Sequence, residues 1–294
     1  MNRRTFHRQL GSLLALSAVH PSAALLGKSD PLRRIGMSTV TFRSRFRQTN
    51  EAVVPEQALT LLEVPRYFGE RFGIRHVEFW SRHFESTEPA YLRDLRAAIE
   101  RENSTLINIQ LDEKYQLSAE DPDQRAESLQ LALRWVDVAE ALGSGAIRVN
   151  PGKGEPAHAI EALRQINAVA QQKGIVLMTE NHFGMAMDPN LHVRLVQEVG
   201  DNMYTLPDFG NYDEEVRYEA LRTVMPYAYQ VSAKTMDFNS SMEHVSYDFD
   251  RCMKIAEESG FKGIYSLEQW SRTPTTVSDE AMVDWMIERI KPYC

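Results

Sequence analysis

Four apolar segments in the second half of the chain each run into a cluster of charged or amide residues. The segments read VLMTENH, YTLPDFGN, YQVSAKT and IYSLEQW, and they end at His182, Asn211, Thr235 and Trp270. A short apolar run that closes on polar residues is typical of a parallel strand, because such a strand is buried on both faces. We therefore expect four parallel strands whose carboxyl ends carry polar side chains to one edge of a sheet.

Strand-like and helix-like segments alternate along the chain at the spacing of βα units, which are roughly 30 residues long. The predicted strands are 34–42, 76–80, 105–112, 146–151, 175–182, 204–211, 228–235 and 263–270. Amphipathic patterns predict helices at 89–102, 128–141, 159–171, 191–199, 249–259 and 279–290. Glycines that predict helix ends precede several strands, namely Gly73, Gly143, Gly174, Gly200 and Gly260.

This alternation predicts an α/β fold, and specifically a (β/α)8 TIM barrel over residues 30–294. A doubly wound open sheet uses the same alternation, but it requires a glycine-rich turn after its first strand. Residues 40–45 read VTFRSR at that place. With 294 residues, of which 43% are hydrophobic, the chain is long enough for one barrel of about 250 residues.

The N-terminus predicts export. Arg3 and Arg4 precede an uncharged, leucine-rich stretch at 9–27, so residues 1–27 resemble a twin-arginine signal whose cleavage point stays open. A membrane-spanning first helix is the alternative, but His20 and Pro21 interrupt the stretch, and a span needs about 20 apolar residues. We expect a periplasmic or otherwise exported protein without a stable membrane anchor after removal of the signal.

Charge and cysteine content exclude two classes of protein. The formal net charge of −8 argues against nucleic acid as a partner, because a phosphate-backbone binder needs basic patches. The two cysteines, Cys252 and Cys294, are too few for a disulfide framework. We expect neither cysteine to be catalytic.

Three predicted strands end in carboxylates, which are Glu180, Asp208 and Glu268. The carboxyl ends of barrel strands converge on one mouth, where three carboxylates would raise one another's pKa unless a cation lay among them. Oxygen ligands favour Mn²⁺ or Mg²⁺ over Zn²⁺. The sequence therefore predicts one divalent metal ion. The alternative is that these are ordinary surface carboxylates in a chain with 41 acidic residues.

The clusters TENH at 179–182, DFGN at 208–211, SAK at 232–234 and LE at 267–268 resemble those of the xylose isomerase-like barrels. This family includes sugar phosphate isomerases and epimerases, and the resemblance covers roughly residues 35–290. It implies that Glu180, Asp208 and Glu268 hold the metal. It also implies a fourth ligand, usually His, from the seventh strand.

This chain departs from the family at that fourth ligand, because Ser232 stands where a His is common. His182 on the fifth strand, Gln230 or Ser232 on the seventh, and water are the substitutes. We rank His182 first because imidazole is the better ligand, although a role in gripping a sugar hydroxyl fits it equally well.

Lys234 closes an apolar strand at the mouth, so we expect it to stabilise a developing enediolate oxygen or to donate a proton. A structural salt bridge is the alternative role for this lysine. For substrate binding the prediction names Glu78, Asn150, Asn211 and Trp270. Other strand-end residues, among them Trp80, Gln110, Asp112 and Arg148, are assigned to packing.

The predicted function is a metal-dependent isomerase or epimerase that acts on an unphosphorylated sugar or keto-sugar through an enediolate. Glu180, Glu268 and Lys234 are its expected catalytic residues. A lyase or hydratase acting on keto-sugar glycosides by β-elimination would use the same site. A catalytically inactive periplasmic sugar-binding barrel is the alternative from another class. An apurinic endonuclease is disfavoured, because it needs a His-rich zinc site and a basic groove. The prediction allows for a homo-oligomer.

Overall fold

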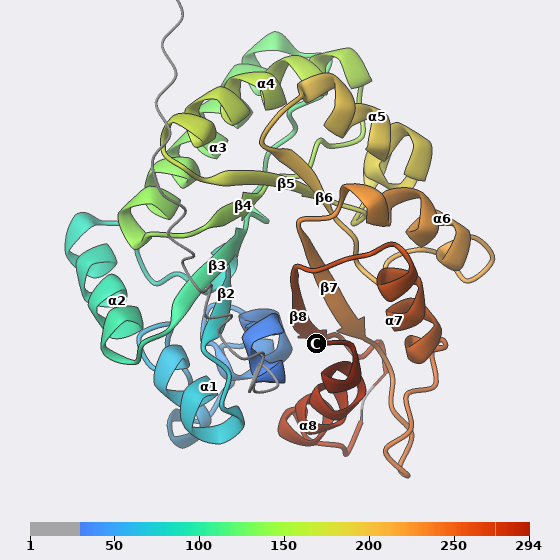
Figure 1. The fold of residues 1–294 in the computed structure, drawn as a ribbon. Helices are drawn as coiled ribbons and strands as arrows, with labels where there is room; N and C mark the ends of the chain where they lie inside the picture. Colours follow the sequence, from blue (N-terminus) through green and yellow to red (C-terminus); the bar gives the residue numbers. More distant parts are fainter. Residues whose placement is uncertain (1–29, 274) are drawn as a thin grey trace, which may run out of the picture.

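The computed structural model describes residues 30–273 and 275–294, which form a barrel of parallel strands surrounded by helices (Figure 1). The strands are β1 (Ile35–Ser38), β2 (His76–Trp80), β3 (Thr105–Gln110), β4 (Ala146–Arg148), β5 (Val176–Glu180), β6 (Met203–Leu206), β7 (Gln230–Thr235) and β8 (Ile264–Gln269). They pair in parallel in the order β6-β5-β4-β3-β2-β1-β8-β7. Isolated bridges between Thr205 and Ala228 and between Asp208 and Ser232 join the two end strands, so the barrel is nearly closed. The predicted (β/α)8 TIM barrel is confirmed.

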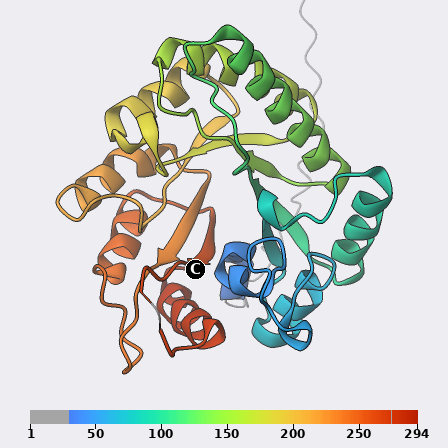
Figure 2. The ribbon, with the colours of Figure 1, turned by 180° about the vertical axis from the view of Figure 1, so that it is seen from behind.

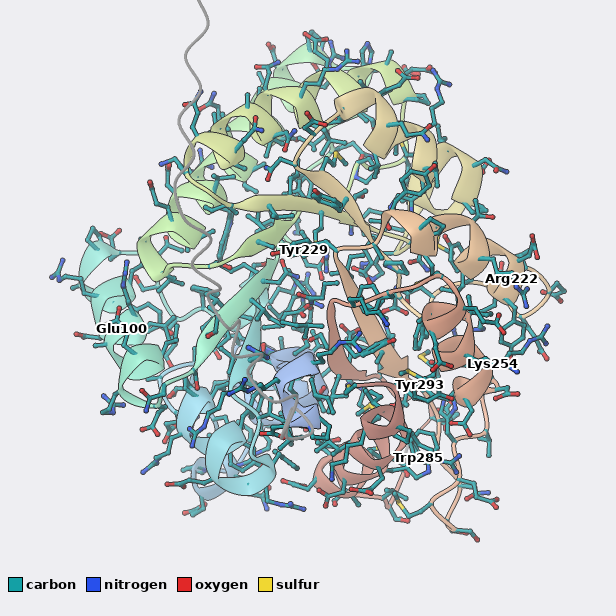
Figure 3. The ribbon with its side chains drawn as sticks, in the orientation of Figure 1. Glu100, Arg222, Tyr229, Lys254, Trp285 and Tyr293 are labelled. Atoms are coloured by element: carbon teal, nitrogen blue, oxygen red, sulfur yellow. The ribbon has the colours of Figure 1, made fainter. Side chains whose placement is uncertain are left out.

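Helices lie on the outside of the strands, as the view from behind also shows (Figure 2). They are α1 (Val64–Phe72), α2 (Pro89–Arg101), α3 (Pro122–Leu142), α4 (Pro156–Gln172), α5 (Pro189–Val199), α6 (Arg217–Val224), α7 (Phe249–Glu258) and α8 (Asp279–Ile290). Each helix buries one face against the barrel. Glu100, Arg222 and Lys254 lie on the outer faces of α2, α6 and α7 and are exposed (Figure 3).

Helices α1 and α6 were not predicted from the sequence. Helix α1 carries Pro65 near its start and Gly69 in its interior, and α6 is only eight residues long, so neither gives a sustained helical period. The predicted helix ends are correct at the glycines. Gly73 and Gly143, for example, have φ angles of 71° and 70°, in the left-handed region that a residue with a Cβ rarely adopts.

Several predicted strands are too long at their carboxyl ends. The first strand ends at Ser38, whose hydroxyl accepts a hydrogen bond from the backbone N–H of Val40 and begins a 3-10 helix, Thr39–Arg45. The sixth strand ends at Leu206, before Pro207, which has no N–H with which to extend a ladder. The cluster at 208–211 therefore lies in a tight turn just beyond its strand, whereas Glu180, Lys234 and Glu268 lie within β5, β7 and β8.

The predicted export signal, 1–27, lies outside the described residues. Among the helices of the described residues, none is both long and apolar enough to cross a membrane.

Candidate active site

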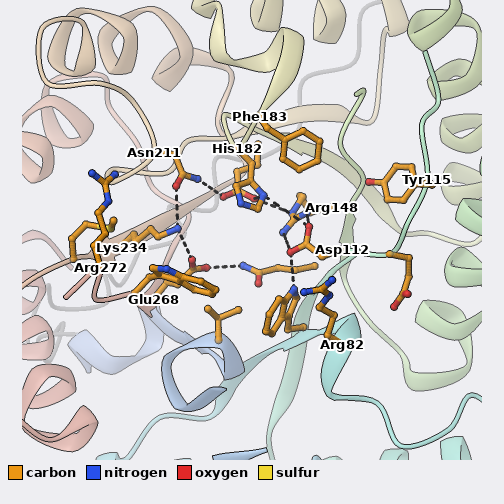
Figure 4. Close-up of a pocket in the computed structure, with 17 residues that line it drawn as sticks. Arg82, Asp112, Tyr115, Arg148, His182, Phe183, Asn211, Lys234, Glu268 and Arg272 are labelled. Carbon is orange, nitrogen blue, oxygen red and sulfur yellow. Dashed lines mark hydrogen bonds and ion pairs between the residues drawn. The ribbon is translucent and has the colours of Figure 1, made fainter. Parts of the chain in front are cut away.

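A cavity of about 490 Å³ opens at the carboxyl ends of the strands, and side chains from most of the barrel line it (Figure 4). Its volume lies within the range of roughly 300–1,000 Å³ that small-molecule sites occupy. The lining residues are Val40, Trp80, Arg82, Gln110, Asp112, Glu113, Tyr115, Arg148, Glu180, His182, Phe183, Asn211, Lys234, Met236, Glu268, Trp270 and Arg272.

Lys234 lines this cavity and contacts two buried carboxylates, of which Glu268 also lines it. Residues 234 and 268 are paired in register on β7 and β8, and the Lys234 Nζ is 3.0 Å from Glu268 Oε1. The same ammonium is 3.6 Å from Asp208 Oδ2 and donates a hydrogen bond of 3.0 Å to Asn211 Oδ1. Burial works to lower the pKa of Lys234, but the carboxylates of Asp208 and Glu268 outweigh it and raise that pKa. Lys234 is therefore a buried, charged ammonium group.

Glycine at position 210 allows this lysine to approach. A Cβ at that position would lie 3.1 Å from Lys234 Cδ, closer than nearly all side chains pack. The backbone N–H groups of Gly210 and Asn211 donate hydrogen bonds of 2.7 and 3.0 Å to Asp208 Oδ1. The turn at 208–211 thus orients the Asp208 carboxylate through Oδ1, while Oδ2 lies on the side of the Lys234 ammonium.

Glu180 is held by a second cation. Its Oε2 lies 3.0 Å from Arg148 Nε, and Asn211 Nδ2 donates a hydrogen bond of 3.0 Å to its Oε1. Arg148 also forms a two-pronged contact with Asp112, at 2.7 and 3.2 Å. Burial raises the pKa of Glu180 to about 7, even though Arg148 works in the opposite direction.

Asn211 connects the two halves of the site. It accepts a hydrogen bond from Lys234 and donates one to Glu180, so a continuous path runs from Glu268 through Lys234 and Asn211 to Glu180 (Figure 4). Gln110 donates to Glu268 Oε2 at 3.0 Å. The carboxylates of Glu180 and Glu268, which both line the cavity, are thus held in fixed orientations.

On the barrel strands and at their carboxyl ends, buried carboxyl groups outnumber buried cationic groups. Four buried carboxyl groups, those of Glu78, Glu180, Asp208 and Glu268, face two buried cations, Arg148 and Lys234. Burial raises the pKa values of Glu78 and Asp208 to about 7, which is the response of carboxylates that lack full compensation.

Several donor atoms near the cavity are of the types that bind a divalent cation. Ser232 Oγ and His182 Nδ1 are buried without a hydrogen-bond partner within the described chain, and the buried Glu180 Oε2 and Asp208 Oδ2 are approached by the cations of Arg148 and Lys234 without a hydrogen bond. Such atoms are costly to bury unless they bind something. As the side chains stand, no three His, Cys, Asp or Glu residues in the described ranges are close enough together to hold one ion. Lys234 and Arg148 lie against the carboxylates instead.

The candidates for a fourth metal ligand differ in what they contact. Gln230 donates a hydrogen bond to Glu78, so its amide is already used. Ser232 is buried, and its backbone forms an isolated parallel β-bridge with Asp208. His182 Nδ1 is 3.9 Å from Asp112 Oδ1 and 4.0 Å from Glu180 Oε2. Burial, followed by the charge of Arg148, lowers the pKa of His182, which favours the neutral ring that a metal or a hydroxyl requires.

Of the four residues predicted to bind substrate, two line the cavity. Asn211 and Trp270 do so, whereas Glu78 and Asn150 do not. Glu78 is fully buried and accepts hydrogen bonds from Asn108 and Gln230. Asn150 Oδ1 accepts a hydrogen bond of 3.2 Å from the backbone N–H of Glu180. Asn150 supports the strand end that carries Glu180.

Several residues of the cavity were assigned to packing or were not marked. The sequence prediction assigns Gln110, Asp112 and Arg148 to packing, whereas in the structure they orient Glu268 and Glu180. The signal was present, because an Arg that closes an apolar strand needs a buried partner as much as Lys234 does. Arg82, in the short 3-10 helix Ser81–His83, and Tyr115 and Arg272, in loops, lie beyond the strands, where no period in the sequence marks them.

A family profile described as "Xylose isomerase-like TIM barrel" matches residues 68–293. A search of curated proteins found no match. Similar solved structures include a xylose isomerase-like TIM barrel protein from Mycobacterium smegmatis in complex with magnesium. It is 16% identical, with a TM-score of 0.64, over 88% of this chain and 97% of that one.

Two other similar structures are epimerases. D-psicose 3-epimerase from Clostridium cellulolyticum H10, with D-tagatose, is 14% identical, with a TM-score of 0.62, over 88% of this chain and 96% of that one. The 3-keto-D-glucoside 4-epimerase from E. coli, in its apo form, is 16% identical, with a TM-score of 0.64, over 86% and 98%. At these identities the likeness concerns the fold.

Proposed function

The chain belongs to the xylose isomerase-like TIM barrel family, and from this premise we propose that it is a divalent metal-dependent sugar isomerase or epimerase. Its substrate would be an unphosphorylated sugar or keto-sugar, and its intermediate an enediolate. The observation that carries the proposal is the path of contacts from Glu268 through Lys234 and Asn211 to Glu180 at one cavity. The sugar epimerases of the same fold support it.

Two carboxylates that reach one cavity can remove a proton from a substrate carbon and return one to the resulting enediolate. One of Glu180 and Glu268 would take the proton from the carbon beside the carbonyl, and the other would return it. Return to the opposite face of that carbon gives epimerisation, and return to the neighbouring carbon gives ketose–aldose isomerisation. Asn211 and Gln110 orient the carboxylates for these transfers.

Lys234 would stabilise the negative oxygen of the enediolate. Its ammonium is buried and already fixed by Glu268 and Asn211, so it needs no reorientation when charge develops on the substrate. Trp270 offers an aromatic face on which the apolar side of a sugar ring can pack.

Glu180, Asp208 and Glu268 would hold the metal ion, with His182 or Ser232 available as a further ligand. A bound divalent ion draws electron density from adjacent carbonyl and hydroxyl oxygens and so acidifies the intervening C–H. The magnesium complex of a similar barrel supports a divalent ion, and the excess of buried carboxylates supports it independently.

The test is hydrogen exchange in deuterated water. The purified protein, supplied with Mn²⁺ or Mg²⁺, is incubated with a panel of ketoses, aldoses and keto-glycosides, and deuterium beside the carbonyl is followed by NMR. Exchange is expected with wild type and should be lost in Glu180→Gln and Glu268→Gln. Glu258→Gln, an exposed position on α7, is the matched control.

The products of this experiment also separate the alternatives. Release of a substituent from a keto-glycoside would assign β-elimination, as in a lyase, to the same residues. Binding of sugars without exchange would assign a binding protein. Exchange that survives both Gln variants would contradict the roles given to Glu180 and Glu268.

A further inference from the structure

A second, outer hollow of about 820 Å³ adjoins the cavity. Four residues, Trp80, Arg82, Glu113 and Trp270, line both spaces, so the two are continuous at the barrel mouth. The remaining residues of the outer hollow come from the loops after β1 and β2 and are Arg43, Ser44, Gln48, Thr49, Asn50, Ser81 and Phe84. None of the contacts that orient Glu180, Lys234 and Glu268 involves these loop residues. The outer hollow therefore has no part in the proton transfer proposed above.

Two tryptophans form the junction between the cavity and the outer hollow. The rings of Trp80 and Trp270 are 6.3 Å apart and nearly perpendicular, at 84°. Trp270 is 36% exposed, so part of its ring is open to a ligand at the hollow that it lines. Aromatic faces at such a junction suit the CH faces of sugar rings. The junction thus resembles the boundary between two saccharide-binding positions.

Two arginines give the outer hollow its charge. Arg43 Cζ lies 4.1 Å from the centroid of the Trp270 ring, and Arg82 Cζ lies 5.5 Å from that of Trp80. Arg43 donates a hydrogen bond of 2.9 Å to the backbone carbonyl of Gln269, but neither arginine forms an ion pair with a carboxylate of the described chain. Glu113 is the single carboxylate among the described lining residues.

These arginines contrast with others at the surface. Arg45, Arg71 and Arg289 each pair with a carboxylate, at 3.3, 2.5 and 2.5 Å. Acidic partners are abundant in a chain of net charge −8. The two guanidinium groups lie over aromatic rings at the hollow without a carboxylate in ion-pair contact, and although Asp279 and Glu268 act on the charge of Arg43, both groups keep N–H donors for a bound anion.

We propose that the outer hollow is a second saccharide subsite that selects a negatively charged unit, a uronate or a sulfated sugar, linked to the sugar in the inner cavity. Arg43 and Arg82 bind its carboxylate or sulfate, and the tryptophans hold the linkage between the two units. The assignment of the reacting unit to the inner cavity rests on the proposed function. The substrate class is then an acidic disaccharide or glycoside rather than a free neutral sugar.

The test is direct binding to an array of saccharides. The array holds neutral disaccharides, their uronic-acid and sulfated counterparts with the same linkages, and the component monosaccharides. For at least one linkage, an acidic disaccharide should bind about tenfold more tightly than its neutral counterpart. The uronate and sulfate arms separate the two sources of negative charge.

Variants connect this preference to the arginines. In the double variant Arg43→Gln, Arg82→Gln, the ratio of neutral to acidic dissociation constants should fall to about one. Arg93→Gln, an exposed arginine on α2, is the matched control and should keep the ratio of the wild type. Circular dichroism of each variant checks that the barrel is folded.

Equal or tighter binding of neutral disaccharides, binding of monosaccharides alone, or no binding of any saccharide would overturn the subsite. A preference that persists in the double variant would overturn the role of the arginines. The binding experiment tests the subsite, whereas exchange with deuterated water tests the proposed catalysis, so the two proposals can fail independently. Exchange on free sugars without an acidic preference removes the subsite alone, whereas an acidic preference without exchange removes the proposed catalysis alone.

Discussion

Lys234 and Glu268 face each other across the last pair of strands, with Nζ 3.0 Å from Oε1, and both side chains are almost fully buried. Register fixes this pair, because residues 234 and 268 are opposite each other in the β7–β8 ladder. The lysine sits where the buried carboxylates of Asp208 and Glu268 need a positive charge. It is therefore a structural counter-ion that also lines the cavity.

Replacement of this lysine should affect catalysis and stability together. In Lys234→Met the rate of hydrogen exchange should fall by about 100-fold or more, because a preorganised charge at the developing enediolate is lost. The free energy of unfolding should fall by about 3 kcal/mol, because buried carboxylates lose their partner. Exchange rates and urea denaturation measure the two effects. Lys254→Met on the exposed face of α7 is the control, and an unchanged exchange rate in Lys234→Met would refute the electrostatic role.

Metal content is a separate prediction that needs no substrate. The mature protein, purified and reconstituted with Mn²⁺ or Mg²⁺, should retain about one ion per chain by elemental analysis. Asp208→Asn and Glu268→Gln should each lose it, because each removes a charged oxygen ligand. Glu258→Gln should retain it. A wild-type protein that takes up no ion would remove the metal from the mechanism.

Export is predicted from the N-terminal sequence. Replacement of Arg3 and Arg4 by Lys should keep the chain in the cytoplasm, because the twin-arginine route reads the arginine pair rather than charge alone. Fractionation of cells that express wild type and variant measures the distribution. Replacement of Arg8 by Lys is the matched control. Equal amounts of both chains outside the cytoplasm would contradict the prediction.

The fold was predictable because the alternation of buried strands and amphipathic helices follows directly from burial. The eight strands lie within a few residues of the predicted positions, and Gly73 and Gly143 end helices as expected. The missed helices, α1 and α6, are short or interrupted by Pro65 and Gly69, so tertiary packing rather than local pattern decides them.

The site was less predictable, because a strand end does not reveal which polar side chains face the cavity and which support them. Glu180, Lys234 and Glu268 do reach the cavity. Glu78 ends up beneath it, because Asn108 and Gln230 supply its hydrogen bonds from neighbouring strands. The pairing of Arg148 with both Asp112 and Glu180 joins three strand ends that are far apart in the sequence. Such contacts depend on the register between strands, which a local sequence pattern does not specify.

Stability should depend on pH through His192, which is fully buried in α5. Its Nε2 lies 3.0 Å from the backbone carbonyl of Thr179, and its Nδ1 has no partner among the described residues. Burial lowers its pKa to about 4, so the unfolded chain, with a pKa near 6.5, binds a proton more readily. Stability from this group is present above about pH 6.5 and is lost as pH falls toward 4.

This group alone should remove about 2 kcal/mol from the free energy of unfolding between pH 7 and pH 5. His192→Gln keeps an N–H for the Thr179 carbonyl but does not titrate. Between pH 7 and pH 5 the free energy of unfolding of this variant should therefore fall by about 2 kcal/mol less than that of the wild type. Urea denaturation at pH 7 and pH 5 measures both chains. The same pH dependence in variant and wild type would show that His192 does not contribute.

Ser232 offers a gain-of-function test of the metal site. Its Oγ is buried and has no hydrogen-bond partner among the described residues. The backbone of Ser232 forms a β-bridge with that of Asp208, so the two residues lie side by side. A histidine at this position would add an imidazole ligand beside the three carboxylates, and imidazole binds divalent transition ions more tightly than a hydroxyl group does. Ser232→His should therefore lower the dissociation constant for Mn²⁺ or Zn²⁺ by about tenfold or more, measured by calorimetry. Ser232→Ala is the matched control and should not tighten binding. If Ser232→His binds the metal no more tightly than wild type, position 232 does not face the ion, and His182 becomes the fourth ligand to test next.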